Sequence, residues 1–122
     1  MKFLLLNGTL KVDSELSNTF TLCQMVKAGF EALGHECELV TLSEMEYKRS
    51  TDDVKDDLQP VIQKMFTVDG LIFATPIWWG GHSSYIQTII ERMDFIETFG
   101  YEKDYKPFYG KVFGTVVSGG GD

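Results

Sequence analysis

The sequence contains few of the residues that characterise secreted, metal-binding or membrane proteins. Its two cysteines, Cys23 and Cys37, form neither a Cys-x-x-Cys pair nor a cluster with histidine, so we expect no disulfide framework and no metal site. The apolar run Phe3–Leu6 is too short for the core of a signal peptide, and no later run approaches the length of a membrane span. We therefore expect a cytoplasmic protein without membrane association.

Basic residues are also scarce. The chain carries 11 Lys and Arg against 18 Asp and Glu, a net charge of −7, which disfavours nucleic acid as a partner. Any bound anion must then be held by local groups. A length of 122 residues with 43% hydrophobic residues allows one globular domain with its own core. We predict a single domain spanning residues 1–122.

Short apolar runs alternate with segments of helical periodicity. We predict strands at residues 2–6, 37–42, 70–75 and 111–118. A helix is expected to begin at Ser17 or Asn18, with an apolar stripe that continues to Leu33, and to end at Gly34. A second helix has Pro60 near its first turn. These elements alternate along the chain, as they do in parallel α/β sheets.

The third predicted helix follows Ser83 or Ser84. Its apolar residues recur at i, i+3, i+4 and i+7, namely Ile86, Ile89, Ile90 and Met93. The polar segment 43–59 is predicted to be a solvated loop whose acidic residues form surface rather than a site. Together the elements predict a doubly wound parallel sheet in a three-layer α/β/α arrangement. Ligands of such sheets bind at the carboxyl ends of the strands.

The loop after the first strand, residues 7–19, has the composition of a phosphate site. It contains a glycine, several hydroxyls and Lys11, and it leads into the N-terminus of a helix. Its spacing matches neither the triphosphate loop nor the dinucleotide fingerprint, so a monophosphate fits better. The alternative is a helix cap within an ordinary hydrophilic loop.

Two further loops follow the third and fourth strands. Trp78 and Trp79 precede Gly80 and Gly81, which suits contact with a planar heteroaromatic ligand, although one tryptophan buried in the core is the alternative. We expect His82 at the surface or near a helix cap rather than as a general base. The glycine run 119–121 either allows a ligand to approach the main chain or is a flexible end.

These motifs resemble the NADPH-dependent FMN reductase family of flavodoxin-like proteins. The resemblance rests on Asn7-Gly8-Thr9 with Ser17-Asn18-Thr19, on the segment 74–80 leading into a serine-capped helix that ends with Glu91-Arg92-Met93-Asp94, and on 118–121. It spans nearly the whole chain. It implies a flavodoxin-like fold that binds FMN, uses NAD(P)H as cosubstrate, passes electrons to a small-molecule acceptor and forms a homodimer.

The resemblance also assigns roles by position. The phosphate would be held by Thr9, Lys11, Ser17, Asn18 and Thr19. The flavin ring would be lined by Pro76, Ile77, Trp78, Trp79 and Gly80, and its other side closed by Ser118, Gly119 and Gly120. The family often has arginine where Lys11 stands, and lysine lacks the planar fork of arginine. The related iron–sulfur flavoproteins carry a cysteine cluster after the second strand, which residues 44–57 lack, so the flavin would be the sole redox centre.

Flavodoxin-like domains continue past the fourth strand with a helix and a fifth strand. Because this sequence stops at Asp122, we expect a C-terminally truncated chain that lacks both elements. That would leave Val112, Phe113, Val116 and Val117 in an uncovered edge strand.

Two alternatives to a reductase stay open. The first is an FMN-binding electron-transfer protein that does not oxidise nicotinamide, whose acidic surface would dock a basic redox partner. The second is a domain that no longer binds FMN or that completes its sheet with another chain. The reductase needs no paired carboxylates or nucleophile, because the cofactor carries the difficult chemistry.

Overall fold

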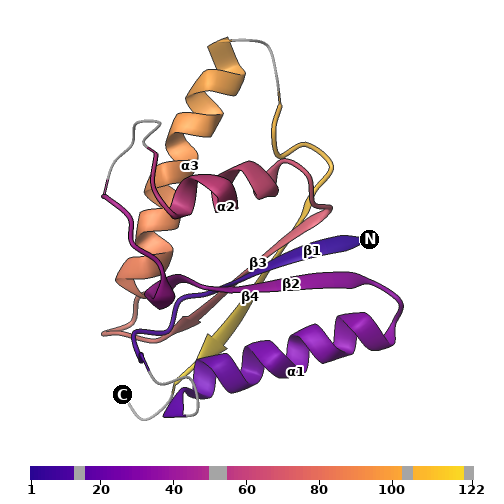
Figure 1. Ribbon diagram of the computed structural model, residues 1–122, viewed down its shortest axis with the longest axis vertical. Coiled ribbons are helices and arrows are strands. Elements are labelled where there is room, and N and C mark those ends of the chain that lie inside the picture. Colours follow the sequence, from indigo (N-terminus) through magenta and orange to yellow (C-terminus); the bar gives the residue numbers. More distant parts are fainter. Residues whose placement is uncertain (13–15, 50–54, 103–105, 120–122) are drawn as a thin grey trace.

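Four parallel strands form one sheet with helices on both faces (Figure 1). The computed structural model describes residues 1–12, 16–49, 55–102 and 106–119, without the side chains of residues 95 and 97–102. The strand order is β2-β1-β3-β4. In chain order the elements are β1 (Lys2–Asn7), α1 (Asn18–Ala32), β2 (Glu36–Thr41), the 3-10 helix η2 (Leu42–Glu44), α2 (Leu58–Met65), β3 (Gly70–Pro76), α3 (Ser84–Glu102) and β4 (Val112–Ser118). The predicted doubly wound α/β fold is confirmed.

The sheet has a hydrophobic core on each face because β1 is apolar on both. Leu4 and Leu6 belong to the core beneath α2 and α3, whereas Phe3 and Leu5 belong to the core beneath α1. Phe3 stacks on Phe30 of α1, with ring centroids 4.1 Å apart. Figure 1 shows α1 on one side of the sheet and both other helices on the opposite side. Because β1 is apolar on both faces, it lies at the centre of the sheet between the two helical layers.

The predicted helix boundaries agree closely with the structure except at the end of α3, which continues to Glu102 instead of ending at Asp94. Ser17 caps α1, since its hydroxyl accepts a hydrogen bond from the backbone N–H of Phe20, and Gly34 follows the helix with φ of +84°. Pro60 is the third residue of α2, where its missing N–H breaks no helical hydrogen bond. Ser83 Oγ accepts from the N–H of Ile86 in the first turn of α3.

Two residues of the predicted helix stripes are exposed instead of buried. Leu33 lies just past the end of α1, and Ile90 lies at the edge of the buried face of α3. Ile86 and Ile89 are buried as expected. The stripe of α3 is therefore narrower than its spacing predicts, because no described element covers the side on which Ile90 lies.

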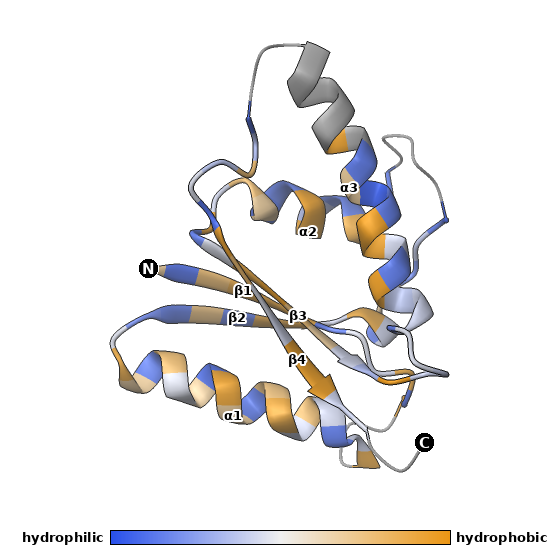
Figure 2. Cartoon of the chain, turned by 180° about the vertical axis from the view of Figure 1, so that it is seen from behind, coloured by the Kyte–Doolittle hydropathy of each residue, from blue (hydrophilic) through white to orange (hydrophobic). Residues whose placement is uncertain are grey.

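The edge strand β4 is apolar and only partly covered. Among the described strands it pairs with β3 alone, and Val112, Phe113 and Val117 are each about half exposed. Val116 packs against the core beneath α1. Figure 2 shows the hydrophobic colour along this strand. The expected exposure is confirmed for Val112, Phe113 and Val117 but is wrong for Val116, because its side chain points to the face that α1 covers. No described helix has the length and apolar character needed to cross a membrane.

Candidate functional site

The register of the sheet brings together the loops that follow β1, β3 and β4, at the carboxyl ends of these strands. Asn7 of β1 pairs with Ala74 of β3, and Pro76 of β3 pairs with Ser118 of β4, so these strands end side by side. The N–H of Gly8 donates to the carbonyl of Ala74 at 2.8 Å. A Cβ at Gly8 would lie 2.5 Å from Cγ1 of Ile86, so only glycine lets the first loop leave β1 along this path.

Buried hydroxyls gather where the first loop enters α1. Thr9, Ser17 and Thr19 are all buried. Ser17 Oγ donates to Thr9 Oγ1 at 2.8 Å. The buried side chain of Asn7 positions this cluster, because its Oδ1 accepts from the N–H of Thr9 at 3.1 Å and its Nδ2 donates to Thr41 Oγ1 at 3.3 Å. The sequence did not predict this role of Asn7; its place at the end of a buried strand was the available signal.

The first turn of α1 adds hydrogen-bond donors to these hydroxyls. The first backbone N–H groups of a helix have no acceptor within it, and the first turn of α1 contains no acidic residue. Asn18 and Lys11 are exposed, and Lys11 Nζ donates to the carbonyl of Leu16 at 2.5 Å. Of the five residues predicted for phosphate, the structure links Thr9 to Ser17 and Thr19 to the third loop. The backbone N–H of Lys11 donates to Thr9 Oγ1 at 3.3 Å, whereas its ammonium bonds to the carbonyl of Leu16 instead of to the cluster, and Asn18 shares the loop at the start of α1.

The third loop is tied to the other two. Ser118 Oγ lies 2.5 Å from Thr19 Oγ1, and the carbonyl of Ser118 accepts from the N–H of Ile77 at 2.9 Å. Gly119 has φ of +141°, and a Cβ there would lie 3.2 Å from Cβ of Ile77. Glycine is therefore required where the third loop passes the second. The predicted residue Gly120 lies outside the described residues.

The second loop is a tight hairpin. The N–H of Trp78 donates to the carbonyl of Gly81 and the N–H of Gly81 to that of Trp78, each at 2.9 Å. Trp79 and Gly80 between them have φ of +50° and +78°. Trp78 is 50% exposed and Trp79 104% exposed, so the alternative of a core tryptophan is wrong. A Cβ at Gly80 would meet no atom within 4 Å, which leaves open space beside the turn.

An apolar groove of about 560 Å³ continues from the carboxyl ends of these strands and lies between α3 and the strands β3 and β4. Its lining includes Thr75, His82, Ile90, Phe113 and Val117. His82 is exposed and its Nε2 lies 2.5 Å from Oε1 of Gln87, which agrees with the expected surface position. The groove follows from the incomplete cover of β4 and α3.

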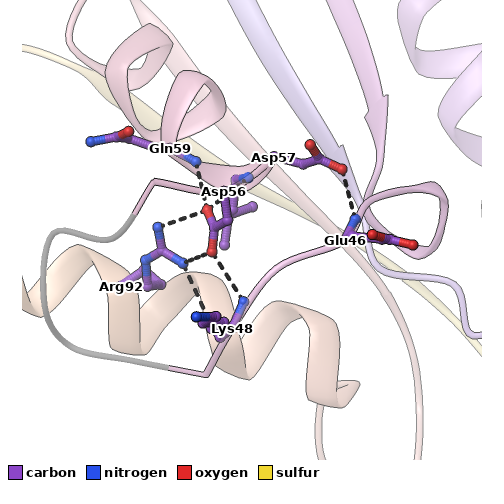
Figure 3. A network of polar contacts seen from close by, with 7 residues as sticks. Glu46, Lys48, Asp56, Asp57, Gln59 and Arg92 are labelled. Atoms are coloured by element: carbon purple, nitrogen blue, oxygen red, sulfur yellow. Dashed lines mark hydrogen bonds and ion pairs between the residues drawn. The ribbon is translucent and has the colours of Figure 1, made fainter.

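The loop after β2 is fixed by a buried ion pair, which corrects the prediction that its acidic residues form only surface. Asp56 and Arg92 join through two hydrogen bonds of 2.8 and 3.1 Å, and their side chains are 8% and 4% exposed (Figure 3). Asp56 also accepts from the N–H groups of Lys48, Leu58 and Gln59. The hydrogen bonds from Arg92, outweighing desolvation, lower the pKa of Asp56 to about 2.

Two thiols and a phenol with shifted pKa values belong to the core or to the loop after β2 rather than to the three converging loops. Burial raises the pKa of Cys23 to about 11 and also raises that of Cys37, and both thiols belong to the core beneath α1. Burial, with Tyr85 nearby, raises the pKa of Tyr47 to about 12, so its phenol stays neutral. These groups are inert near neutral pH, and neither cysteine lies in the loop after β2.

The fold and the arrangement of these loops are those of flavodoxin-like α/β proteins. The family model described as NADPH-dependent FMN reductase matches residues 1–122, and the chain belongs to this family. The resemblance identified from the sequence is thus confirmed.

Individual relatives agree with this assignment. The chain is 26% identical to an iron–sulfur flavoprotein of Archaeoglobus fulgidus, over 98% of this chain and 60% of the relative. It is 28% identical to 8-demethyl-8-aminoriboflavin-5'-phosphate synthase of Streptomyces davaonensis, over 100% of this chain and 52% of the relative. A crystal structure of RosB with bound 8-demethyl-8-formylriboflavin-5'-phosphate has a TM-score of 0.82 at 27% identity, and covers 100% of this chain and 53% of RosB.

The chain spans about half to three fifths of the length of these relatives. Family membership and the flavin-related relatives support FMN as the cofactor, as expected from the sequence. The described residues fit this cofactor. The oxygens of a phosphate monoester accept hydrogen bonds from hydroxyls, from the first N–H groups of a helix and from an ammonium, and the first loop contains all three. The open space beside Gly80 leaves room for the flavin ring.

Proposed function

We propose that this chain binds FMN at the carboxyl edge of its sheet and acts as an NAD(P)H-dependent oxidoreductase that reduces a small-molecule acceptor. The observation that carries the proposal is the convergence of three loops on one edge. A buried hydroxyl cluster at the start of α1 is tied through Thr19 and Ser118 to the loop that carries both tryptophans. Cofactor sites of open α/β sheets lie at such an edge.

In this proposal the first loop binds the phosphate. Thr9, Ser17 and Thr19 supply hydroxyls, Asn18 and Thr19 supply N–H groups, and Lys11 exchanges the carbonyl of Leu16 for a phosphate oxygen. The positive end of the α1 dipole adds to this attraction. A local site of this kind is needed because the chain as a whole carries a net charge of −7.

The other two loops hold the flavin ring. Pro76, Ile77, Trp78, Trp79 and Gly80 form one wall, and Ser118, Gly119 and Gly120 form the opposite wall. A bound FMN would supply the redox chemistry between reduced nicotinamide and the acceptor. The protein's part is to orient the ring and limit its contact with water. Backbone N–H groups near Gly80 and Gly119 are the donors that would bond to the ring's polar edge.

The test is an absorbance spectrum of the purified protein incubated with FMN and passed over a desalting column. Flavin bands that bleach when NADPH is added without oxygen would support the proposal. Bands that persist with NADPH but bleach with dithionite would replace it with the electron-transfer protein. Absence of flavin bands would contradict FMN binding by this chain.

The remaining features belong to the same proposal. We infer a cytoplasmic, single-domain protein that works as a homodimer. The tryptophan-bearing hairpin supports the homodimer, because it exposes two large aromatic side chains near one another. Sedimentation of the FMN-loaded chain over a range of concentrations would test it: a single monomeric species at every concentration would contradict it.

A further inference from the structure

The loop after β2 and the start of α3 enclose a second pocket, separate from the apolar groove. Its volume is about 410 Å³, which is within the range of small-molecule sites. The residues that line it come from the first loop (Leu10), from the segment 45–49 after β2, and from α3 (Ser84, Tyr85 and Thr88). None of them belongs to the residues proposed to hold FMN. The proposed flavin site therefore leaves this pocket unused.

Hydrogen bonds fix the wall that the loop after β2 contributes (Figure 3). The N–H of Glu46 donates to Asp57 Oδ2 at 2.8 Å, and the N–H of Lys48 donates to Asp56 Oδ2 at 3.0 Å. Arg92, which is paired with Asp56, also donates to the carbonyl of Lys48 at 3.3 Å. The backbone of this wall is thus held at two points. A wall that is fixed before a ligand arrives loses little conformational freedom when the ligand binds.

The lining combines aromatic rings with charges of both signs. The rings of Tyr47 and Tyr85 make an edge contact, with centroids 6.1 Å apart. Arg49 is exposed and is the one cation among the described lining residues, and no carboxylate in the described part of the chain pairs with it. Glu46 is the one carboxylate in the same lining. A plain anion would be both attracted and repelled here, so the lining favours a ligand that carries an anionic group, a flat ring and a hydrogen-bond donor.

A nicotinamide dinucleotide carries these three groups at its adenosine end. When its nicotinamide meets the flavin at the carboxyl ends of the strands, the adenosine end reaches a neighbouring surface. The pocket provides such a surface, because Leu10 belongs to the proposed phosphate loop and Ser84 follows the tryptophan-bearing hairpin closely in the chain. The amino group of adenine is a donor that suits Glu46, and a ribose phosphate is an anion that suits Arg49.

We propose that this pocket binds the adenosine end of the cosubstrate, and that Arg49 binds its 2′-phosphate and so distinguishes NADPH from NADH. The inference rests on the proposed function and assigns a place to its cosubstrate. A guanidinium bonds two phosphate oxygens at once, whereas the 2′-hydroxyl of NADH offers it one neutral acceptor. Tyr85 packs against the adenine ring. Arg49 is a specificity-determining residue in this arrangement, because it lies outside the walls of the flavin ring.

The experiment measures the KM for NADPH and the KM for NADH in the FMN-loaded chain, with ferricyanide as the acceptor. Arg49→Met should raise the KM for NADPH about tenfold, because a charged contact to the phosphate is lost, and should leave the KM for NADH and both kcat values nearly unchanged. Lys48→Met is the matched control. Lys48 is the exposed neighbour of Arg49 and has the same charge, but it does not line the pocket. Its substitution should leave both KM values unchanged.

A second readout does not need turnover. Adenosine 2′-monophosphate should bind to the loaded chain in a calorimetric titration and should compete with NADPH in the assay. Its affinity should fall about tenfold in Arg49→Met and stay the same in Lys48→Met. Inorganic phosphate at the same concentration should neither bind nor compete, because it lacks the ring and the amino group.

Three results would overturn the inference. An unchanged KM for NADPH in Arg49→Met, or an equal rise for NADPH and NADH, would show that Arg49 does not bind the 2′-phosphate. Binding of adenosine 2′-monophosphate without competition would assign the pocket to a nucleotide other than the cosubstrate. Equal competition by inorganic phosphate would show that no adenosine is recognised. Failure of the proposed function is distinguishable, because the wild-type chain would then show no flavin bands or no bleaching by NADPH.

Discussion

The hydroxyls of Thr19 and Ser118 lie 2.5 Å apart although 99 positions separate them in the sequence. This contact joins the start of α1 to the end of β4, which are the proposed phosphate loop and the proposed outer wall of the ring site. Removal of either hydroxyl would leave the other without this hydrogen bond in a partly buried position. The two parts of the site are therefore coupled through one hydrogen bond.

We expect Thr19→Val, which keeps the shape of the side chain and removes its hydroxyl, to weaken FMN binding severalfold and to destabilise the fold by about 1 kcal/mol. Hydrogen exchange at the N–H of Gly119 should become faster, because the third loop loses its tie to α1. Thr21→Val is the matched control, since the Thr21 hydroxyl bonds only to a carbonyl at the start of its own helix. Equal losses of FMN affinity in the two variants would contradict this coupling.

Lys11 provides a test of the phosphate loop that is independent of the ring. Lys11→Met should weaken binding of FMN by about three- to tenfold, because a charged donor to the phosphate is lost, and should leave binding of riboflavin, which has no phosphate, unchanged. Lys11→Arg should strengthen FMN binding, since a guanidinium can bond two phosphate oxygens at once. Quenching of flavin fluorescence measures both affinities.

Lys64→Met is the control for net charge, because Lys64 is an exposed residue of α2 that pairs with Glu38 of β2. It should change the affinity for FMN far less than Lys11→Met does. If both variants lose affinity equally, the effect is one of overall charge, and a specific contact of Lys11 with the phosphate is ruled out.

The layers and most element boundaries could be predicted from local pattern. The apolar β1, the Ser17 cap and the Gly34 stop each depend on residues within one or two turns, and the structure places each as expected. The glycine at position 8 was part of the predicted loop, but the reason for it, a close approach to Ile86, appears only after α3 packs on the sheet.

Contacts between distant segments could not be predicted in the same way. Asp56 and Arg92 are 36 positions apart in the sequence. Asp56 lies in a polar segment whose composition is typical of solvated surface, so nothing distinguishes it there from the other acidic residues. The hairpin at Trp79 was missed for a different reason, because its Trp-Gly turn lacks the Asn-Gly or Asp-Gly pair that marks such turns. Tertiary context, rather than local preference, determines both features.

The pair of Asp56 and Arg92 gives the third prediction. Asp56→Asn should destabilise the fold by about 3 kcal/mol at neutral pH, because it removes the carboxylate that binds the buried Arg92 guanidinium through two hydrogen bonds. Asp57→Asn is the matched control: Asp57 is an exposed neighbour with one hydrogen bond to the N–H of Glu46, and its loss should cost less than about 1 kcal/mol. Urea unfolding of both variants and the wild type measures the difference.

The same pair predicts a pH dependence. The pKa of Asp56 falls from 3.8 to about 2 on folding, so its contribution to stability is fully present above about pH 5 and is lost as the pH falls toward 2. The difference in unfolding free energy between wild type and Asp56→Asn should therefore be constant from pH 7 to pH 5 and shrink below pH 4. A difference that stays constant down to pH 2.5 would contradict the assigned role of the carboxylate.

The exposed edge at β4 gives the last prediction. A long apolar edge strand is a template for pairing with other chains, and β4 carries no charge, proline or other feature that discourages it. We expect Val112→Lys to slow aggregation of the chain, because a lysine on the edge strand opposes approach of a second edge. Light scattering at a fixed protein concentration measures the rate.

The matched control is Met25→Lys, which adds the same charge at an exposed apolar residue of the helix α1 rather than of the edge strand. Both variants change the net charge from −7 to −6, so a general effect of charge on solubility must act on the two alike. Slower aggregation in Val112→Lys alone would identify the β4 edge as the surface through which chains associate. Equal rates in the two variants would contradict a specific role of this strand, since the position of the lysine would then not matter.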